Sequence, residues 1–236
     1  MNGTDADGVA LIGHRGCAGQ CPENTVRAFE RAAPHVDAVE LDVRRCASGE
    51  LVVVHDETLD RLTEATGRVA ETPWSELRAL SVLDSGEPIP RLDHALAAVP
   101  ADTAVNVELK QPEVASDALA AARGVENEVW FSSFLPGTLA AIRDRDRDAD
   151  RALLVADAGS DRAVAAAVDR ATELDCVAVH PSIALATEPG FVDAAHGADL
   201  TVNAWTAADR ADAARLREAG VDGIIADRWD LLRDRG

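Results

Sequence analysis

Glu40 and Asp42 stand two residues apart in the run VDAVELDVRR, and His55 follows them closely along the chain. Residues two apart on a strand point to the same face, so the two carboxylates are expected to act together. Two carboxylates beside an imidazole could bind a metal ion and transfer protons. The alternative is that they are ordinary polar residues on a solvated strand face. The surrounding run is otherwise apolar and its polar residues fall on one side, which favours a functional site.

A β-hairpin would bring the imidazole to the carboxylates. The segments Val36–Val43 and Leu51–His55 are rich in valine and leucine, and Ser48-Gly49 between them supplies residues that a two-residue turn favours. Counting outward from that turn places Asp42 directly opposite His55 on one face. The hairpin is therefore predicted to gather all three side chains on a single surface.

Further candidates follow other predicted strands. His14 and Arg15 come directly after the first apolar run, while Glu108 and Lys110 end a later one. Lys110 is the only lysine, and arginine fills the 22 other cationic positions. This indicates that the position beside the strand carboxylate requires the compact charge of an ammonium group. The alternative is a random surface residue.

Strand and helix patterns alternate along most of the chain. Strands are expected at 9–13, 36–43, 104–109, 129–133, 152–156, 176–180, 200–205 and 223–226, with a helix opened by Glu23-Asn24-Thr25 and others at 92–99, 113–123, 136–144, 160–173, 188–196 and 207–219. Eight parallel strands with alternating helices predict a closed (β/α)8 TIM-like barrel, an α/β fold whose active site lies at the carboxyl ends of the strands. An open doubly wound sheet is the alternative, but it would require a Gly-rich phosphate fingerprint that HRGCAGQC does not supply.

Two segments fall outside this alternation. Only seven residues separate Val43 from Leu51, too few for a parallel crossover, so the strand at 51–55 is predicted to be antiparallel. Residues 57–91 are expected to form a small insertion with one helix at 72–77, capped by Thr72 and anchored by Trp74. The insertion could also shape the substrate pocket. The chain 1–236 is predicted to be a single catalytic barrel domain.

Composition excludes several classes of partner. The formal net charge is -19, from 26 Asp and 16 Glu against 22 Arg and one Lys. Such a surface repels nucleic acid and anionic lipid, so we expect no nucleic-acid partner and no stable membrane association. The apolar runs fall short of the roughly 20 residues of a membrane span. The acidic start MNGTDADG carries no secretory pattern, so a cytoplasmic location is expected.

The same acidic, nearly lysine-free composition is typical of halophile-like surfaces and predicts salt-dependent stability. Like charges on the folded surface repel one another, and salt screens that repulsion. We expect the midpoint of thermal unfolding to rise between low and molar salt. An unchanged midpoint would contradict this prediction.

The four cysteines are predicted to be packing residues. Cys17, Cys21, Cys46 and Cys176 match no zinc-binding spacing, and disulfides are rare in a cytoplasmic protein.

The polar candidates are predicted to converge on one mouth of the barrel, because the strands that carry them are neighbours. Three carboxylates without thiolates suit one hard divalent cation, Mg²⁺ or Ca²⁺, and two imidazoles beside it could act as general acid and base. Cationic side chains inside so negative a protein indicate an anionic substrate, most simply a phosphate ester.

Short motifs recur along almost the whole chain: His14-Arg15-Gly16, Pro22-Glu23-Asn24-Thr25, Glu40-Leu41-Asp42-Val43, His55-Asp56, Glu108-Leu109-Lys110, Ser133-Phe134, Trp205-Thr206, Gly220-Val221-Asp222-Gly223-Ile224-Ile225 and Asp227. In this order they resemble the motifs of the glycerophosphodiester phosphodiesterase family, whose members are PLC-like phosphodiesterase TIM barrels. Each motif is weak alone, but the set is specific. The chain departs from the family at the turn Ala47-Ser48-Gly49 and at Ala226, and neither position holds a proposed ligand.

The resemblance implies a function and a set of site residues. The implied reaction is metal-dependent hydrolysis of a glycerophosphodiester to glycerol phosphate and an alcohol, in lipid and glycerol metabolism. The implied roles are metal binding by Glu40, Asp42 and Glu108, acid/base catalysis by His14 and His55, phosphate binding by Arg15 and Lys110, and packing of Trp205 on the alcohol, unless Trp205 is a core residue at the barrel top. A phospholipase-like or other phosphodiesterase on the same barrel and a catalytically inactive phosphodiester-binding barrel are the alternatives.

Overall fold

Eight parallel strands close into a barrel in the computed structural model, which describes residues 8–156 and 161–232. The strands are β1 (Ala10–Gly13), β2 (Ala38–Arg45), β3 (Leu51–Val53), β4 (Ala104–Leu109), β5 (Val129–Ser133), β6 (Arg151–Val155), β7 (Ala178–Pro181), β8 (Thr201–Ala207) and β9 (Gly223–Ala226). The sheet order is β1-β9-β8-β7-β6-β5-β4-β2-β3, and a parallel pairing of β1 with β2 closes the barrel. The predicted TIM-like barrel is confirmed, and an open doubly wound sheet is excluded.

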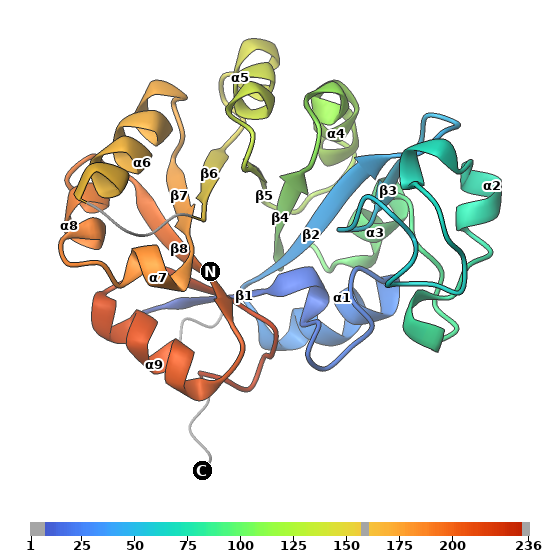
Figure 1. Cartoon of the computed structure of the whole chain (residues 1–236), viewed down its shortest axis with the longest axis horizontal. Coiled ribbons are helices and arrows are strands. Elements are labelled where there is room, and N and C mark those ends of the chain that lie inside the picture. The colour runs from blue at the N-terminus through green and yellow to red at the C-terminus, as the bar shows by residue number, and fades with distance from the viewer. Residues whose placement is uncertain (1–7, 157–160, 233–236) are drawn as a thin grey trace.

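Helices surround the strands on the outside of the barrel (Figure 1). They are α1 (Val26–Ala32), α2 (Trp74–Leu77), α3 (Leu92–Ala98), α4 (Ala115–Ala122), α5 (Pro136–Arg145), α6 (Asp161–Glu173), α7 (Ile183–Ala186), α8 (Phe191–His196) and α9 (Arg210–Ala219), with 3-10 turns at His14–Gly16, Ala33–His35, Val69–Glu71, Val82–Asp84 and Pro112–Val114. Among the described residues, no helix combines the length and the hydropathy that a membrane span requires.

The helix boundaries differ from the predicted ones where local chemistry intervenes. The helix expected at 188–196 is shorter and corresponds to α8, and a further helix, α7, precedes it and was not predicted. The helix expected at 207–219 begins only at Arg210, because β8 continues to Ala207 and the Asp209 side chain accepts hydrogen bonds from the first backbone amides. Residue 160, the predicted start of α6, and residues 1–7 of the acidic N-terminal run lie outside the described residues.

The hydrophobic core lies mainly between the strands and the surrounding helices. Strand residues such as Val39 and Val202 pack there against helix residues such as Phe29 and Leu216, all fully buried. The four cysteines are free and buried, as the packing interpretation predicted. The rigid wall of the barrel fixes the positions of side chains at the strand ends.

The insertion has its own small hydrophobic core. Leu59, Leu62 and Leu77 are buried there, together with residues of the β2–β3 hairpin, and half-buried Trp74 packs at its edge. The predicted cap Thr72 is wrong. The Thr72 hydroxyl instead donates to the Arg68 carbonyl, and the helix begins at Trp74.

The β2–β3 hairpin is antiparallel as predicted, but its register differs by one residue. Val43 pairs with Val53, so Asp42 faces Val54, whose backbone N–H donates to the Asp42 carbonyl at 2.9 Å. The predicted pairing of Asp42 with His55 is therefore wrong. The cause is a three-residue loop in place of a two-residue turn, closed by Gly49 at a φ of 101°. Moreover, β3 ends at Val53, two residues before His55.

Candidate active site

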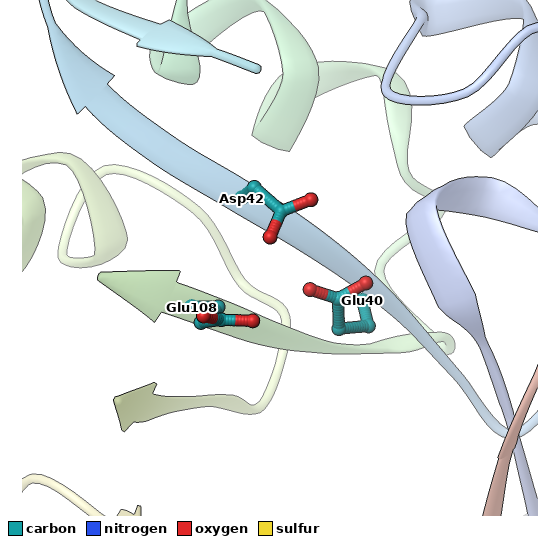
Figure 2. Close-up of side chains that lie close together, drawn as sticks. All are labelled: Glu40, Asp42 and Glu108. Carbon is teal, nitrogen blue, oxygen red and sulfur yellow. The ribbon is translucent and has the colours of Figure 1, made fainter. Parts of the chain in front are cut away.

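Three buried carboxylates meet on the neighbouring parallel strands β2 and β4. Asp42 on β2 pairs in register with Glu108 on β4, and Glu40 lies two residues before Asp42 on the same face. One oxygen of each carboxylate lies within 4.8 Å of the other two. Figure 2 shows the three side chains leaving the two strands toward a common centre. The convergence predicted for these residues is confirmed by the geometry.

The loop after β1 holds two of these carboxylates. The Arg15 backbone N–H donates to Glu40 Oε2 at 2.8 Å, and Arg15 Nε lies 3.3 Å from Asp42 Oδ2. Asn24 Nδ2 donates to the same Asp42 oxygen at 2.7 Å. Glu40 Oε1, by contrast, is buried and has no hydrogen-bond partner among the described residues. A buried carboxylate oxygen left in this way is suited to ligate a cation.

A tight backbone turn explains why His-Arg-Gly follows β1. Arg15, Gly16 and Cys17 all have positive φ values, at 50°, 74° and 65°. A Cβ at Gly16 would lie 2.7 Å from the Cβ of Ala28 on α1, so only glycine permits this approach. The turn brings both the Arg15 amide and its guanidinium to the carboxylates.

Lys110 supplies a second cation at the cluster. Its ammonium lies 2.8 Å from Asp42 Oδ1 and also donates to Glu108 Oε1. Burial disfavours the charged ammonium, but the charges of Asp42 and Glu108 outweigh it and raise the pKa of Lys110. The only lysine of the chain therefore stays charged next to the site, as predicted from its position.

Burial and mutual repulsion raise the pKa of two of the carboxyls. Burial, followed by the charges of Asp42 and Glu108, holds the pKa of Glu40 well above its usual range. Burial and the Asp42 charge raise the pKa of Glu108 to about 7. Burial alone would also raise the pKa of Asp42, but the charges of Lys110 and Arg15 outweigh burial and hold this pKa below its usual range. A cation at the centre would relieve this repulsion.

The raised pKa of Glu108 predicts a pH-dependent stability of the metal-free protein. Its carboxyl holds a proton in the folded state up to about pH 7, whereas the unfolded chain releases it near 4.5. The contribution of Glu108 to stability is therefore full below pH 4.5 and is lost as pH rises through 7. We expect the free energy of unfolding of Glu108→Gln, relative to that of the wild type, to be higher at pH 8 than at pH 4. Chemical denaturation with a chelator present measures this difference. A difference between the two proteins that does not change with pH would contradict this expectation.

Both candidate catalytic histidines are oriented by an aspartate. Nδ1 of His14 lies 2.7 Å from Asp227 Oδ1, and Nδ1 of His55 lies 2.7 Å from Asp56 Oδ1. A carboxylate on Nδ1 fixes the tautomer that carries the proton there and leaves Nε2 as the acceptor. Burial lowers the pKa of His55, against the opposing effect of Asp42, which favours a neutral imidazole.

His55 reaches the site through a turn after β3. The chain leaves the ladder at Val53, and Arg44 Nε donates to the His55 carbonyl at 2.8 Å. The imidazole then lines the same cavity as Glu40 and Glu108, although the predicted strand register did not place it there.

One cavity of about 90 Å³ brings the predicted residues together. Its lining comprises His14, Arg15, Glu40, His55, Asn106, Glu108, Lys110, Phe134, Leu154, Trp205, Thr206 and Ile225. Asp42 lies fully buried beside it, in contact with Lys110. The indole N–H of Trp205 donates to the His180 carbonyl at 2.8 Å, and the exposed ring of Phe134 meets the indole edge to face at 5.4 Å. Two aromatic rings thus border a charged pocket.

Sequence reasoning gave no role to several residues that support the site. Asn24, Asp56 and Asp227 lie within matched motifs, yet their contacts with Asp42 and the two histidines were not predicted. The ion pairs of Glu23 with Arg15 and Arg61 were not predicted either. Their signal is weak, because 28% of the chain is charged and ion pairs cannot be assigned from charge alone.

The chain is similar to known phosphodiesterases over nearly its whole length. The model of the Glycerophosphoryl diester phosphodiesterase family matches residues 14–231. The Uncharacterized protein YqiK of Bacillus subtilis (strain 168) is 31% identical over 238 residues, covering 92% of this chain and 94% of that protein. A glycerophosphodiester phosphodiesterase of Caldanaerobacter subterraneus subsp. tengcongensis is 30% identical over 237 residues, covering 94% and 95%. The solved structure of an Oleispira antarctica phosphodiesterase in complex with the product sn-glycerol-3-phosphate has a TM-score of 0.83 at 27% identity, covering 94% of each chain.

Proposed function

Because the chain belongs to the glycerophosphoryl diester phosphodiesterase family, we propose that it hydrolyses glycerophosphodiesters to glycerol phosphate and an alcohol by metal-assisted histidine catalysis. The observation that carries this proposal is the shared cavity. Two aspartate-paired imidazoles and two cationic side chains border three buried carboxylates there. The solved Oleispira antarctica relative with bound sn-glycerol-3-phosphate supports the substrate class.

The carboxylate cluster fits one divalent cation, Mg²⁺ or Ca²⁺. Its donors are all oxygens, they lie within 4.8 Å of one another, and Glu40 Oε1 is unpartnered among the described residues. Glu40, Asp42 and Glu108 would hold the ion. When bound, such a cation polarises a phosphoryl oxygen and offsets the charge that develops on it.

Arg15 and Lys110 are proposed to bind the phosphoryl group. Both side chains line the cavity, and each already contacts Asp42. They provide positive charge where the substrate anion must lie, inside a protein with a net charge of -19. Charge-assisted hydrogen bonds from a guanidinium and an ammonium stabilise an anionic phosphate and the charge that develops on it.

His14 and His55 are proposed as the acid/base pair. Asp227 and Asp56 hold their Nδ1 protons, which leaves each Nε2 to exchange a proton with the substrate. One imidazole, neutral, takes the proton from the nucleophile at Nε2, and the other, entering the step as an imidazolium, donates its Nε2 proton to the leaving alcohol oxygen. The nucleophile is either water or a neighbouring hydroxyl of the substrate. A substrate analogue without that hydroxyl distinguishes them, because its cleavage is abolished only in the second case.

Trp205 and Phe134 are proposed to contact the non-phosphate part of the substrate. Their rings meet edge to face at the cavity, and Phe134 is 41% exposed. Phe134 in this position gives Trp205 an aromatic neighbour at the rim, which favours a packing role against the alcohol over a purely structural one.

The test of this function is alcohol release from a panel of deacylated phosphodiesters with choline, ethanolamine and inositol groups. We expect cation-dependent release from at least one of them and little activity on lipids with intact acyl chains. Preference for intact lipid would support the phospholipase-like alternative. Binding of the diester without release would support the inactive binding barrel.

A further inference from the structure

Arg61, in the insertion, joins two carboxylates that each contact a proposed site residue. Its Nε and Nη2 donate to the two oxygens of Asp56, at 2.7 and 3.0 Å. Its Nη1 and Nη2 donate to the two oxygens of Glu23, at 2.7 and 2.8 Å. All three guanidinium nitrogens are therefore engaged, in two bidentate pairs. Such forks fix geometry in a way that a point charge cannot.

Each of these carboxylates touches one side of the proposed active site. Asp56 Oδ1 lies 2.7 Å from Nδ1 of His55, and Glu23 Oε1 accepts from Arg15 Nη1 at 2.9 Å. The proposed acid/base imidazole and the proposed phosphate-binding guanidinium are thus each one carboxylate away from Arg61. A single side chain therefore binds both carboxylates.

The backbone of the insertion holds Arg61 in place. Leu59 and Leu62 on either side are buried in the insertion core, and a turn is closed by hydrogen bonds to the Leu59 carbonyl from Leu62 N at 3.1 Å and Thr63 N at 2.9 Å. The residues that line the cavity come from outside 57–91. Among the described residues, the insertion therefore contributes none to the cavity lining, and Arg61 reaches the site only through Asp56 and Glu23.

The negative charges of Glu23 and Asp56 explain why a cation is placed between them. Glu23 is buried with its side chain 8% exposed, and Asp56 lies near it, so two anions would repel each other without a cation between them. Hydrogen bonds from Arg61 are the main cause that lowers the pKa of Asp56 to about 2, so the folded structure stabilises the carboxylate that His55 contacts. Loss of Arg61 would free both carboxylates to move away from their partners.

We propose that Arg61 is a positioning residue that couples the orientation of His55 to that of Arg15 through Asp56 and Glu23. This inference rests on the proposed function, in which those two residues act on the substrate. It assigns the insertion a part in catalysis, although its described residues stay outside the cavity.

The test compares Arg61→Met and Arg61→Lys with Arg68→Met as the control. Arg68 lies in the same insertion and pairs with Glu57 and Glu71 on the exposed surface. We expect Arg61→Met to lower kcat/KM by about 10- to 100-fold, with a lower kcat and weaker binding of inorganic phosphate. Arg61→Lys should recover only part of this loss, because an ammonium cannot form two bidentate pairs. Arg68→Met should match the wild type, and thermal unfolding should show all variants folded.

Double variants separate positioning from a general structural effect. In an Asp56→Asn background, Arg61→Met should lower kcat by less than about threefold, because its route to His55 is already broken. In a Glu23→Gln background, Arg61→Met should leave the dissociation constant of inorganic phosphate nearly unchanged. The inference is overturned if Arg61→Met lowers kcat and phosphate affinity by the same factors in these backgrounds as in the wild type, or if Arg61→Met alone has wild-type kinetics. If the wild type releases no alcohol from any diester, the proposed function fails, whereas the phosphate-binding measurements still test the Arg15 branch.

Discussion

Glu40→Gln is expected to lower phosphodiester hydrolysis by at least ~10³-fold and, in the absence of metal, to make the protein more stable. The loss of activity follows from removal of a charged oxygen donor, because a bound cation supplies several kcal/mol of transition-state stabilisation. The gain in stability follows from burial and repulsion by Asp42 and Glu108, which raise the pKa of the Glu40 carboxyl. A neutral amide of the same shape removes that repulsion.

Calorimetric titration with Mg²⁺ and Ca²⁺, together with thermal unfolding with and without a chelator, measures both effects of this substitution. The cation should raise the unfolding temperature of the wild type and leave that of Glu40→Gln unchanged, because only binding to the folded state stabilises it. Glu76→Gln is the matched control, since Glu76 is exposed on α2. Undiminished cation binding in Glu40→Gln would remove this residue from the metal site.

The barrel could be predicted because its signal is spread over the whole chain. Each strand and helix carries its own period, and β4 (Ala104–Leu109), β5 (Val129–Ser133) and β9 (Gly223–Ala226) match their predicted bounds. The count of eight parallel strands then predicts a closed barrel in which the carboxyl ends of all strands lie at one mouth. The site residues on β2 and β4 could be placed together for the same reason, since parallel strands bring their carboxyl ends to one mouth.

The hairpin register could not be predicted in the same way, because it depends on one torsion angle. Ser48-Gly49 suits a two-residue turn, but Gly49 at φ 101° closes a three-residue loop and moves every pairing by one. The predicted neighbour of Asp42 was therefore wrong. His55 still reaches the cavity, because β3 ends at Val53, two residues before it, and the register no longer applies there. The imidazole contacts Asp56 and lines the cavity together with His14 and Arg15.

The ionic supports of the site could not be predicted because they join distant parts of the chain. Asp227 meets His14 across 213 residues, and this contact exists only once the last strand closes on the first. Arg61 reaches Glu23 across 38 residues from a segment without regular periodicity. In a chain with 42 acidic side chains, sequence alone cannot select these partners.

His14→Ala and His55→Ala are each expected to lower kcat by at least ~10²-fold while the protein stays folded, because each removes one proton transfer. Both imidazoles are partly exposed at the cavity, with side chains 19% and 37% accessible, so truncation leaves the core intact. His94→Ala is the control, since His94 is exposed on α3. Steady-state kinetics on a cleaved diester measure the effect.

The pH dependence of the residual activity then separates the two roles. A general base must be unprotonated, so its loss removes the acidic limb of the kcat/KM profile, whereas loss of the general acid removes the basic limb. Burial lowers the pKa of His55 and favours its neutral form, so we expect His55→Ala to lose the acidic limb and His14→Ala the basic limb. The opposite pattern would exchange the two roles. Near-wild-type turnover in either variant would remove that histidine from the mechanism, since an aspartate-oriented imidazole in this cavity would then do no more than line it.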